Sequence, residues 1–224
     1  MISDCIPNES YTMSLFRLMY SDYRRYIVAG ETNPLHAIFA TQGLWASSVY
    51  RVSHWLFVNT NVPILRGLVL FGCQIASKIT EVLTGISLSY RCTIGQGLYI
   101  GHFGNIFVGA PVRIGSNCNL SQGVTIGIGG RGTARGVPVI GDRVHVGPNA
   151  VVAGKITIGN DVAIGACTVV TRSIPDRAVV IGNPSSIVWY DGSFPLVSYD
   201  GMDEDPQRVA SQAKVKPSDT SENA

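Results

Sequence analysis

The stretch from Leu88 to Val170 repeats an aliphatic residue every six positions, with one shift of two residues after Val112 and one interruption after Ile126. Every repeated position is Ile, Leu or Val: Leu88, Ile94, Ile100, Ile106, Val112, Ile114, Leu120, Ile126, Ile140, Val146, Val152, Ile158, Ile164 and Val170. Glycine directly follows eight of them: Gly95, Gly101, Gly115, Gly127, Gly141, Gly147, Gly159 and Gly165. Neither the 3.6-residue period of a helix nor the two-residue alternation of a strand gives this spacing.

A six-residue period with one inward aliphatic side chain and a following glycine predicts a very short strand and then a corner. Three such sides close a coil of about eighteen residues, and coils stacked about 4.8 Å apart extend parallel sheets along one axis. The sequence therefore predicts a mainly β fold, a parallel β-helix over residues 86–190.

Residues 1–85 carry helical patterns, and we expect them to form an α-helical N-terminal domain. Apolar and aromatic residues recur at spacings of three and four in 10–26 and 42–58. Asn33 and Pro34 suit the start of a further helix, since Asn caps helices and Pro is favoured at the first helical position. Gly85 suits the end of the last one.

The apolar segment 63–83 resembles a membrane span in composition. Arg66, Gln74, Lys78 and Glu81 interrupt it, so its longest uncharged run is shorter than the roughly 20 residues that cross a bilayer. We therefore expect a packed helix and no integral membrane segment.

The C-terminal segment, residues 191–224, differs in composition from the repeats. From about Ser198 it becomes polar and charged, with Pro206 and Pro217 and few apolar residues. Such a composition cannot bury enough apolar surface to offset the entropy of ordering, and it predicts a disordered tail.

Charge and cysteine content narrow the class of protein. The 17 Lys and Arg residues against 15 Asp and Glu give a net charge of +2, which disfavours nucleic acid as a partner. The 5 cysteines are an odd number, and Cys92, Cys118 and Cys167 fall in small-residue positions of the repeat. No secretory signal pattern is visible at the N-terminus. We expect a reduced, cytoplasmic protein.

Two features break the regularity, and interruptions of a repeat scaffold often carry function. One is His102, two residues after Ile100; the other is the glycine-rich stretch 127–139, which is too long for one side of a coil and must form an outward loop. Imidazole titrates near neutral pH and suits a general base for acyl transfer to a hydroxyl. Arg131 and Arg135 in the loop suit an anionic acceptor or a cofactor phosphate.

The repeats resemble the hexapeptide-repeat acyltransferases, and serine acetyltransferases in particular. The resemblance rests on segments 94–98 and 121–127, on His102, and on the helical segment 50–56, Tyr-Arg-Val-Ser-His-Trp-Leu. It implies a left-handed coil, acetyl-CoA as co-substrate, His102 as general base, and a homotrimer with its sites between subunits. Further pairing of trimers through the helical domains stays open.

The resemblance also assigns candidate binding residues. By position, the residues expected beside acetyl-CoA are Gly127, Gly147, Ala166 and Arg172. Those expected beside the acceptor are Asn33, Ser87, Gly101, Arg131 and Arg135.

Several of the acceptor positions depart from the family pattern. Gly101 stands where the family has Asp, Ser87 where it has the carboxylate that pairs with the catalytic His, and Asn33 where it has Asp. Binding a serine ammonium calls for carboxylates, because an unpaired desolvated charge is costly. These departures therefore favour a sugar or polysaccharide-precursor hydroxyl as acceptor, with serine O-acetyltransferase as the alternative.

The same residues bear on two other functions. A non-catalytic β-helix scaffold is a further alternative, against which His102 and the outward loop argue. Only His102 and His145 lie in the repeats, so a three-histidine zinc site is not expected.

Overall fold

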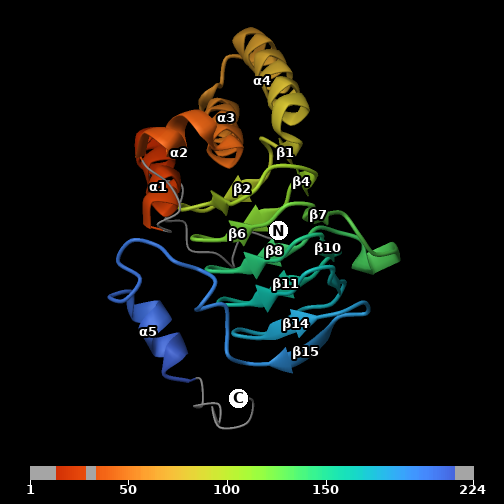
Figure 1. Cartoon of the computed structure of the whole chain (residues 1–224). Coiled ribbons are helices and arrows are strands. Elements are labelled where there is room, and N and C mark those ends of the chain that lie inside the picture. Colours follow the sequence, from red (N-terminus) through yellow and green to blue (C-terminus); the bar gives the residue numbers. More distant parts are fainter. Residues whose placement is uncertain (1–13, 29–33, 215–224) are drawn as a thin grey trace.

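The computed structural model describes residues 14–28 and 34–214 of the chain. Four helices form one end of the molecule (Figure 1): α1 (Leu15–Val28), α2 (Pro34–Ala40), α3 (Gln42–Asn59) and α4 (Pro63–Thr84). Asn33, expected to cap the second helix, lies outside the described residues. Gly85 adopts the left-handed conformation directly after α4, as expected for a C-terminal glycine.

The strands that follow wind into a parallel β-helix. Their bounds are β1 (Ile86–Leu88), β2 (Thr93–Ile94), β3 (Tyr99–Ile100), β4 (Ile106–Val108), β5 (Arg113–Ile114), β6 (Asn119–Leu120), β7 (Thr125–Gly127), β8 (Val139–Ile140), β9 (His145–Val146), β10 (Val151–Ala153), β11 (Thr157–Ile158), β12 (Ala163–Ile164), β13 (Val169–Val170), β14 (Val179–Ile181) and β15 (Ser186–Trp189). Only β15 pairs antiparallel among the described strands, and it covers the last coil.

Successive strands join three different sheets, which form the three faces of a prism. Sheet A has the order β1-β4-β7-β10-β13, sheet B has β11-β8-β5-β2, and sheet C has β15-β14-β12-β9-β6-β3. Each coil passes from A to B to C and back to A. The corners between C and A form one edge of the prism, the C–A edge, and those between A and B form another, the A–B edge.

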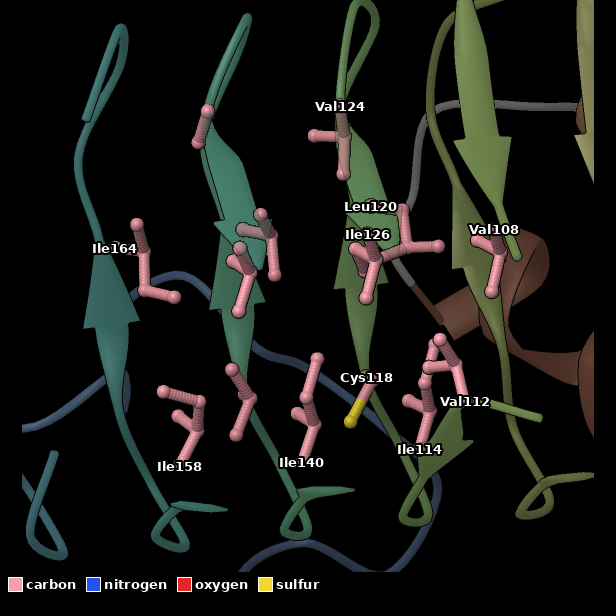
Figure 2. Packing of buried hydrophobic residues seen from close by; sticks show 14 of the residues in the cluster. Val108, Val112, Ile114, Cys118, Leu120, Val124, Ile126, Ile140, Ile158 and Ile164 are labelled. Carbon is pink, nitrogen blue, oxygen red and sulfur yellow. The ribbon is translucent and has the colours of Figure 1, made fainter. Parts of the chain in front are cut away.

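The inward aliphatic side chains stack in register from coil to coil. In sheet A the strand pairings align Leu88, Val108, Ile126, Val152 and Val170 in one column, each at most 6% exposed. Figure 2 shows members of these columns side by side inside the prism. Strands of two or three residues have little stability alone, so this shared core holds them together.

The register places the shift of the six-residue repeat at a different corner from the one predicted. Leu88 and Val108 pair across one coil and are 20 residues apart, whereas Val108 and Ile126 are 18 apart. The spacing of six holds from Leu88 to Ile100, so the two additional residues lie in the corner that carries His102. The first irregularity of the repeat is thus a lengthened corner.

The sequence analysis misplaced this shift because Ile106 and Val112 are also buried, at 1% and 0% exposed. Ile106 pairs with Ile86, which shows that it occupies a second inward position, two residues before the column of Leu88. Because an aliphatic residue also occupies this second inward position, the six-residue spacing in the sequence continues past the corner that holds the two extra residues.

The glycines after the aliphatic positions allow neighbouring coils to pack closely, because a side chain there would clash with the next coil. A Cβ on Gly115 would lie 2.5 Å from the carbonyl oxygen of Gly141, and one on Gly147 would lie 2.7 Å from that of Ile164. The left-handed backbone conformation occurs two residues later, at Asn117 and Asn149 for these coils. Asparagine tolerates that conformation better than most residues.

A buried ion pair fixes the helices to the first coil. The Arg51 guanidinium donates to both oxygens of Asp22, at 2.9 and 3.0 Å, and to the carbonyl oxygens of Ile94 and Gly95, at 2.6 Å each. Asp22 also accepts the backbone N–H of Leu98 at 2.8 Å. Both side chains are at most 2% exposed. The pair thus joins α1 and α3 to β2 and its following corner.

Helix α4 is packed on one side only, so the expectation of a packed helix is right for part of its surface. It contacts α3 and β1. Its other side exposes large apolar residues, among them Leu68, Phe71 and Val82 at 68%, 63% and 84%. The stretch Leu65–Thr84 is long and apolar enough to cross a membrane by length and composition alone, with 11% of it buried.

The predicted disordered tail is wrong for the residues that the structure describes beyond Ser198. Helix α5 (Pro206–Gln212) is capped by Asp205, which accepts the N–H groups of Gln207 and Arg208. The buried Arg208 guanidinium donates to the carbonyls of Val197 and Phe194, at 2.8 and 2.9 Å. These polar contacts order a segment whose composition offers little apolar surface.

The buried ion pair predicts a large difference between two matched substitutions. Asp22→Asn leaves the Arg51 guanidinium buried without its counter-charge and is expected to lower the free energy of unfolding by about 3–5 kcal/mol. Asp200→Asn removes the exposed partner of Arg24 and should leave the free energy of unfolding nearly unchanged, because solvent screens exposed ion pairs. Urea unfolding at a fixed protein concentration measures both. Similar losses for the two variants would contradict a docking role for the buried pair.

The reactivity of two buried thiols, Cys92 and Cys118, tests the packing inside the prism. Burial raises the pKa of Cys92 and of Cys118 to about 12, so at pH 8 only about one thiol in 10⁴ is ionised and reactive. Cys167 is exposed. Iodoacetamide at pH 8 should therefore modify Cys167 first, and the other two only after unfolding, as read by peptide mass spectrometry. Fast modification of Cys118 in the folded protein would count against this packing.

Candidate functional site

His102 lies on the C–A edge, in the lengthened corner between β3 and β4, and is exposed to solvent. The corner is held from both sides of the stack. The Gly104 N–H donates to the Thr84 carbonyl, and the Gly104 carbonyl accepts the Gly123 N–H, at 3.0 Å each. The His102 imidazole has no hydrogen-bond partner among the described residues, so it is free to meet a ligand.

A carboxylate that the sequence analysis did not assign lies beside this corner. Glu81, in the last turn of α4, accepts a hydrogen bond from the Ser87 hydroxyl at 3.1 Å. It also accepts one from Lys78 at 2.8 Å, which is the main reason that the pKa of Glu81 lies below its usual range. The available signal was the position of Glu81 four residues before the helix-ending Gly85, which puts it in the last turn of α4, close to the start of the repeats.

The stretch 127–139 forms the predicted outward loop, at the A–B edge between β7 and β8 (Figure 1). Gly129 and Gly136 exchange two backbone hydrogen bonds of 3.0 Å at its base, and the 3-10 helix η2 (Gly132–Ala134) forms its tip. Arg131 and Arg135 are both exposed, and neither side chain has an ion-pair partner in the described part of the chain. The loop is thus a folded finger with two free cations.

The residues expected beside acetyl-CoA divide between two edges. Gly147 and Ala166 follow β9 and β12 on the C–A edge, below His102 in the stack, and Ala166 is exposed. Gly127 and Arg172 lie on the A–B edge with the loop. Gly127 and Gly147 are buried, and the Arg172 guanidinium donates to the Ser185 carbonyl. Ala166 and Arg172 are therefore the two exposed residues of this set.

The residues expected beside the acceptor are also separated. Gly101 lies with His102 at the C–A edge, and Ser87 lies in β1, a strand of sheet A that begins at this edge. Arg131 and Arg135 lie at the A–B edge, across the width of sheet A. Asn33 is outside the described residues. A Cβ on Gly101 would lie 3.2 Å from the Tyr99 ring, so a side chain there would require that ring to shift slightly. One chain brings together half of the expected site.

Two cavities in the described part of the chain lie away from His102. A cavity of about 600 Å³ is lined by the edge between sheets B and C together with α5, and one of about 450 Å³ lies beside α1. Neither is lined by His102, Arg131 or Arg135. These two cavities therefore do not contain the candidate base or the loop cations.

Two further histidines, His54 and His145, are partly buried. His54 Nδ1 lies 2.9 Å from the Tyr90 carbonyl oxygen, and burial lowers the pKa of His54 and of His145. Within residues 14–28 and 34–214, no group of three His, Cys, Asp or Glu side chains is placed to hold a metal ion.

The chain is similar to known transferases over most of its length. Residues 138–172 match the family model of the bacterial transferase hexapeptide (six repeats). Serine acetyltransferase of Synechococcus elongatus is 30% identical over 203 residues, which are 90% of this chain and 78% of that protein. Serine acetyltransferase of Staphylococcus xylosus is 34% identical over 158 residues, 70% of this chain and 69% of that protein.

Solved structures give the same similarity. The soybean serine acetyltransferase apoenzyme matches with a TM-score of 0.69 at 27% identity, covering 78% of this chain and 69% of that chain. The soybean enzyme complexed with serine matches with a TM-score of 0.66 at 28% identity, covering 78% and 70%. These matches confirm the predicted fold class, a left-handed parallel β-helix of hexapeptide repeats with N-terminal helices. The chain therefore belongs to the serine acetyltransferase family of hexapeptide-repeat acyltransferases.

Proposed function

We propose that the protein transfers the acetyl group of acetyl-CoA to the hydroxyl of L-serine, with His102 as the general base. The observation that carries the proposal is the exposed His102 imidazole on the one corner of the repeat that is two residues longer than its neighbours in the stack. A free imidazole at an exposed corner can take a proton from a bound hydroxyl.

The proposed reaction is a direct displacement at the thioester. His102 removes the proton of the acceptor hydroxyl as its oxygen bonds to the acetyl carbonyl carbon; the carbon–sulfur bond then breaks, and the CoA thiolate takes up the proton from the imidazolium. Backbone N–H groups at the corners suit the stabilisation of the developing oxyanion.

Two observations support serine as the acceptor. The relatives described above are serine acetyltransferases, and the similarity to the cyanobacterial one extends over 90% of the chain, helices included. In addition, Glu81 brings a carboxylate to the position of Ser87, where the sequence analysis found none. Both favour the acceptor that the sequence analysis ranked second.

A sugar or polysaccharide-precursor hydroxyl is the second candidate acceptor. The observation that favours it is Gly101 beside His102, which offers no carboxylate for an ammonium group. A neutral sugar hydroxyl would not need one.

The acceptor and the base are tested together by CoA release from acetyl-CoA. L-Serine is expected to give saturable turnover well above that with nucleotide sugars or oligosaccharides. His102→Ala should lower kcat by about 10²–10⁴-fold, whereas His36→Ala, which removes another exposed histidine, should leave it unchanged. Turnover with a sugar but not with serine would show that the second candidate is the acceptor. Full activity of His102→Ala would show that His102 is not the general base.

We propose further that the active unit is a homotrimer whose sites lie between chains. His102 and the loop cations lie on different edges of one prism. A ring of three chains pairs one edge of each copy with a different edge of the next, which is how a heterologous interface closes. In such a ring His102 of one copy would meet Arg131 and Arg135 of its neighbour.

Mixed assemblies test this arrangement. His102→Ala chains and chains with both Arg131→Ala and Arg135→Ala are each expected to be inactive alone. Trimers reassembled from an equal mixture should recover about one quarter of the wild-type activity. In such a mixture about one site in four combines an intact His102 from one chain with intact loop arginines from its neighbour. Recovery would be absent if each site were formed within one chain.

A further inference from the structure

The structure brings one carboxylate to the His102 corner from outside the repeats. Glu81 belongs to α4, yet its Oε2 accepts the hydroxyl proton of Ser87 in β1 at 3.1 Å. This is the side-chain contact by which the acidic residue of α4 reaches sheet A.

Helix α4 ends directly on the His102 corner. The Thr84 carbonyl accepts the Gly104 N–H and the Gly85 carbonyl accepts the Ile106 N–H, both at 3.0 Å. A Cβ on Gly85 would lie 2.9 Å from the Gly104 Cα, so the two chain segments touch. Gly104 is two residues after His102.

Ser87 is also held at this edge. Strand β1 pairs with β4 in parallel register, with Ser87 opposite Phe107, and β4 is the strand into which the His102 corner leads. Ser87 points outward, because its neighbours Ile86 and Leu88 are the buried residues of the strand. Glu81 and Ser87 therefore lie on the outer surface of sheet A, beside the strand into which the His102 corner leads.

The hydrogen bonding of Ser87 leaves it able to serve a second partner. A serine hydroxyl has one proton to donate and two lone pairs to accept with. Its proton is directed to Glu81, so its lone pairs remain for an N–H donor such as a ring nitrogen of imidazole. Lys78, whose side chain is 75% exposed, is the charged group that contacts Glu81 from the same helix; β1 presents only the neutral Ser87 to it.

We propose that Glu81 is a positioning residue for His102, acting through the Ser87 hydroxyl. The His102 side chain, which has no hydrogen-bond partner among the described residues, would turn toward sheet A when the acceptor binds and donate from one imidazole nitrogen to Ser87, which would keep the other nitrogen unprotonated and facing the acceptor hydroxyl. The carboxylate also stabilises the imidazolium that forms when the proton is taken. This inference rests on the proposed role of His102 as general base.

The test compares two carboxamide substitutions in the full-length protein. Glu81→Gln keeps the shape and the acceptor for Ser87 but removes the charge, and it should lower kcat at least about tenfold with the KM for acetyl-CoA within twofold of wild type. Glu204→Gln, at an exposed turn far along the chain, is the matched control and should be unchanged.

The pH profile separates a positioning role from a structural one. Without the carboxylate, the acidic limb of kcat/KM should move to lower pH by about half a unit or more, because the imidazolium loses a favourable charge. Ser87→Ala should give the same loss of kcat, and the double variant should lose no more than either single one. Ser87→Ala also serves as the test if Glu81→Gln does not fold.

The outcomes distinguish this inference from the function on which it rests. If His102→Ala is inactive but Glu81→Gln and Ser87→Ala keep wild-type kcat and an unchanged acidic limb, the positioning role is wrong and the general base stands. If His102→Ala retains activity, the proposed base itself fails. Additive losses in the double variant would also overturn a shared path through Ser87.

Discussion

The structure depends on the stacking of aliphatic side chains in columns inside a three-sided coil. Each strand of two or three residues is stable only because the coils above and below present an aliphatic residue at the same place. A coil can therefore lengthen only at its corners. For this reason the two extra residues around His102 and the longer insertion in the loop 127–139 both project from the prism, and both are exposed to solvent.

The helices add what the repeats cannot provide. The Arg51–Asp22 pair fixes α1 and α3 to the first coil through charge and backbone carbonyls. Helix α4 runs directly into β1 through Gly85, so its last turn is carried to the His102 corner. A carboxylate on a helix thereby becomes part of the surroundings of a repeat corner, although the repeats themselves place none beside His102 on the first coil.

The position of the loop relative to His102 links the fold to assembly. A rigid prism keeps its edges apart, so a base on one edge and cations on another cannot converge within a chain. A closed ring of copies brings different edges together. Family membership supports acetyl transfer, and the separation of the two edges is the physical reason for proposing that the site lies between chains.

The sequence by itself determined the β-helix, because the period of six can be satisfied by no other regular structure, and it singled out His102 and the loop as departures from that period. Only the tertiary structure decided the coil register. Backbone hydrogen bonds between coils, rather than the aliphatic count, placed the extra residues at His102 and showed Ile106 at a second inward position. It also decided that Glu81 meets Ser87, because that contact depends on the direction in which α4 packs against the first coil.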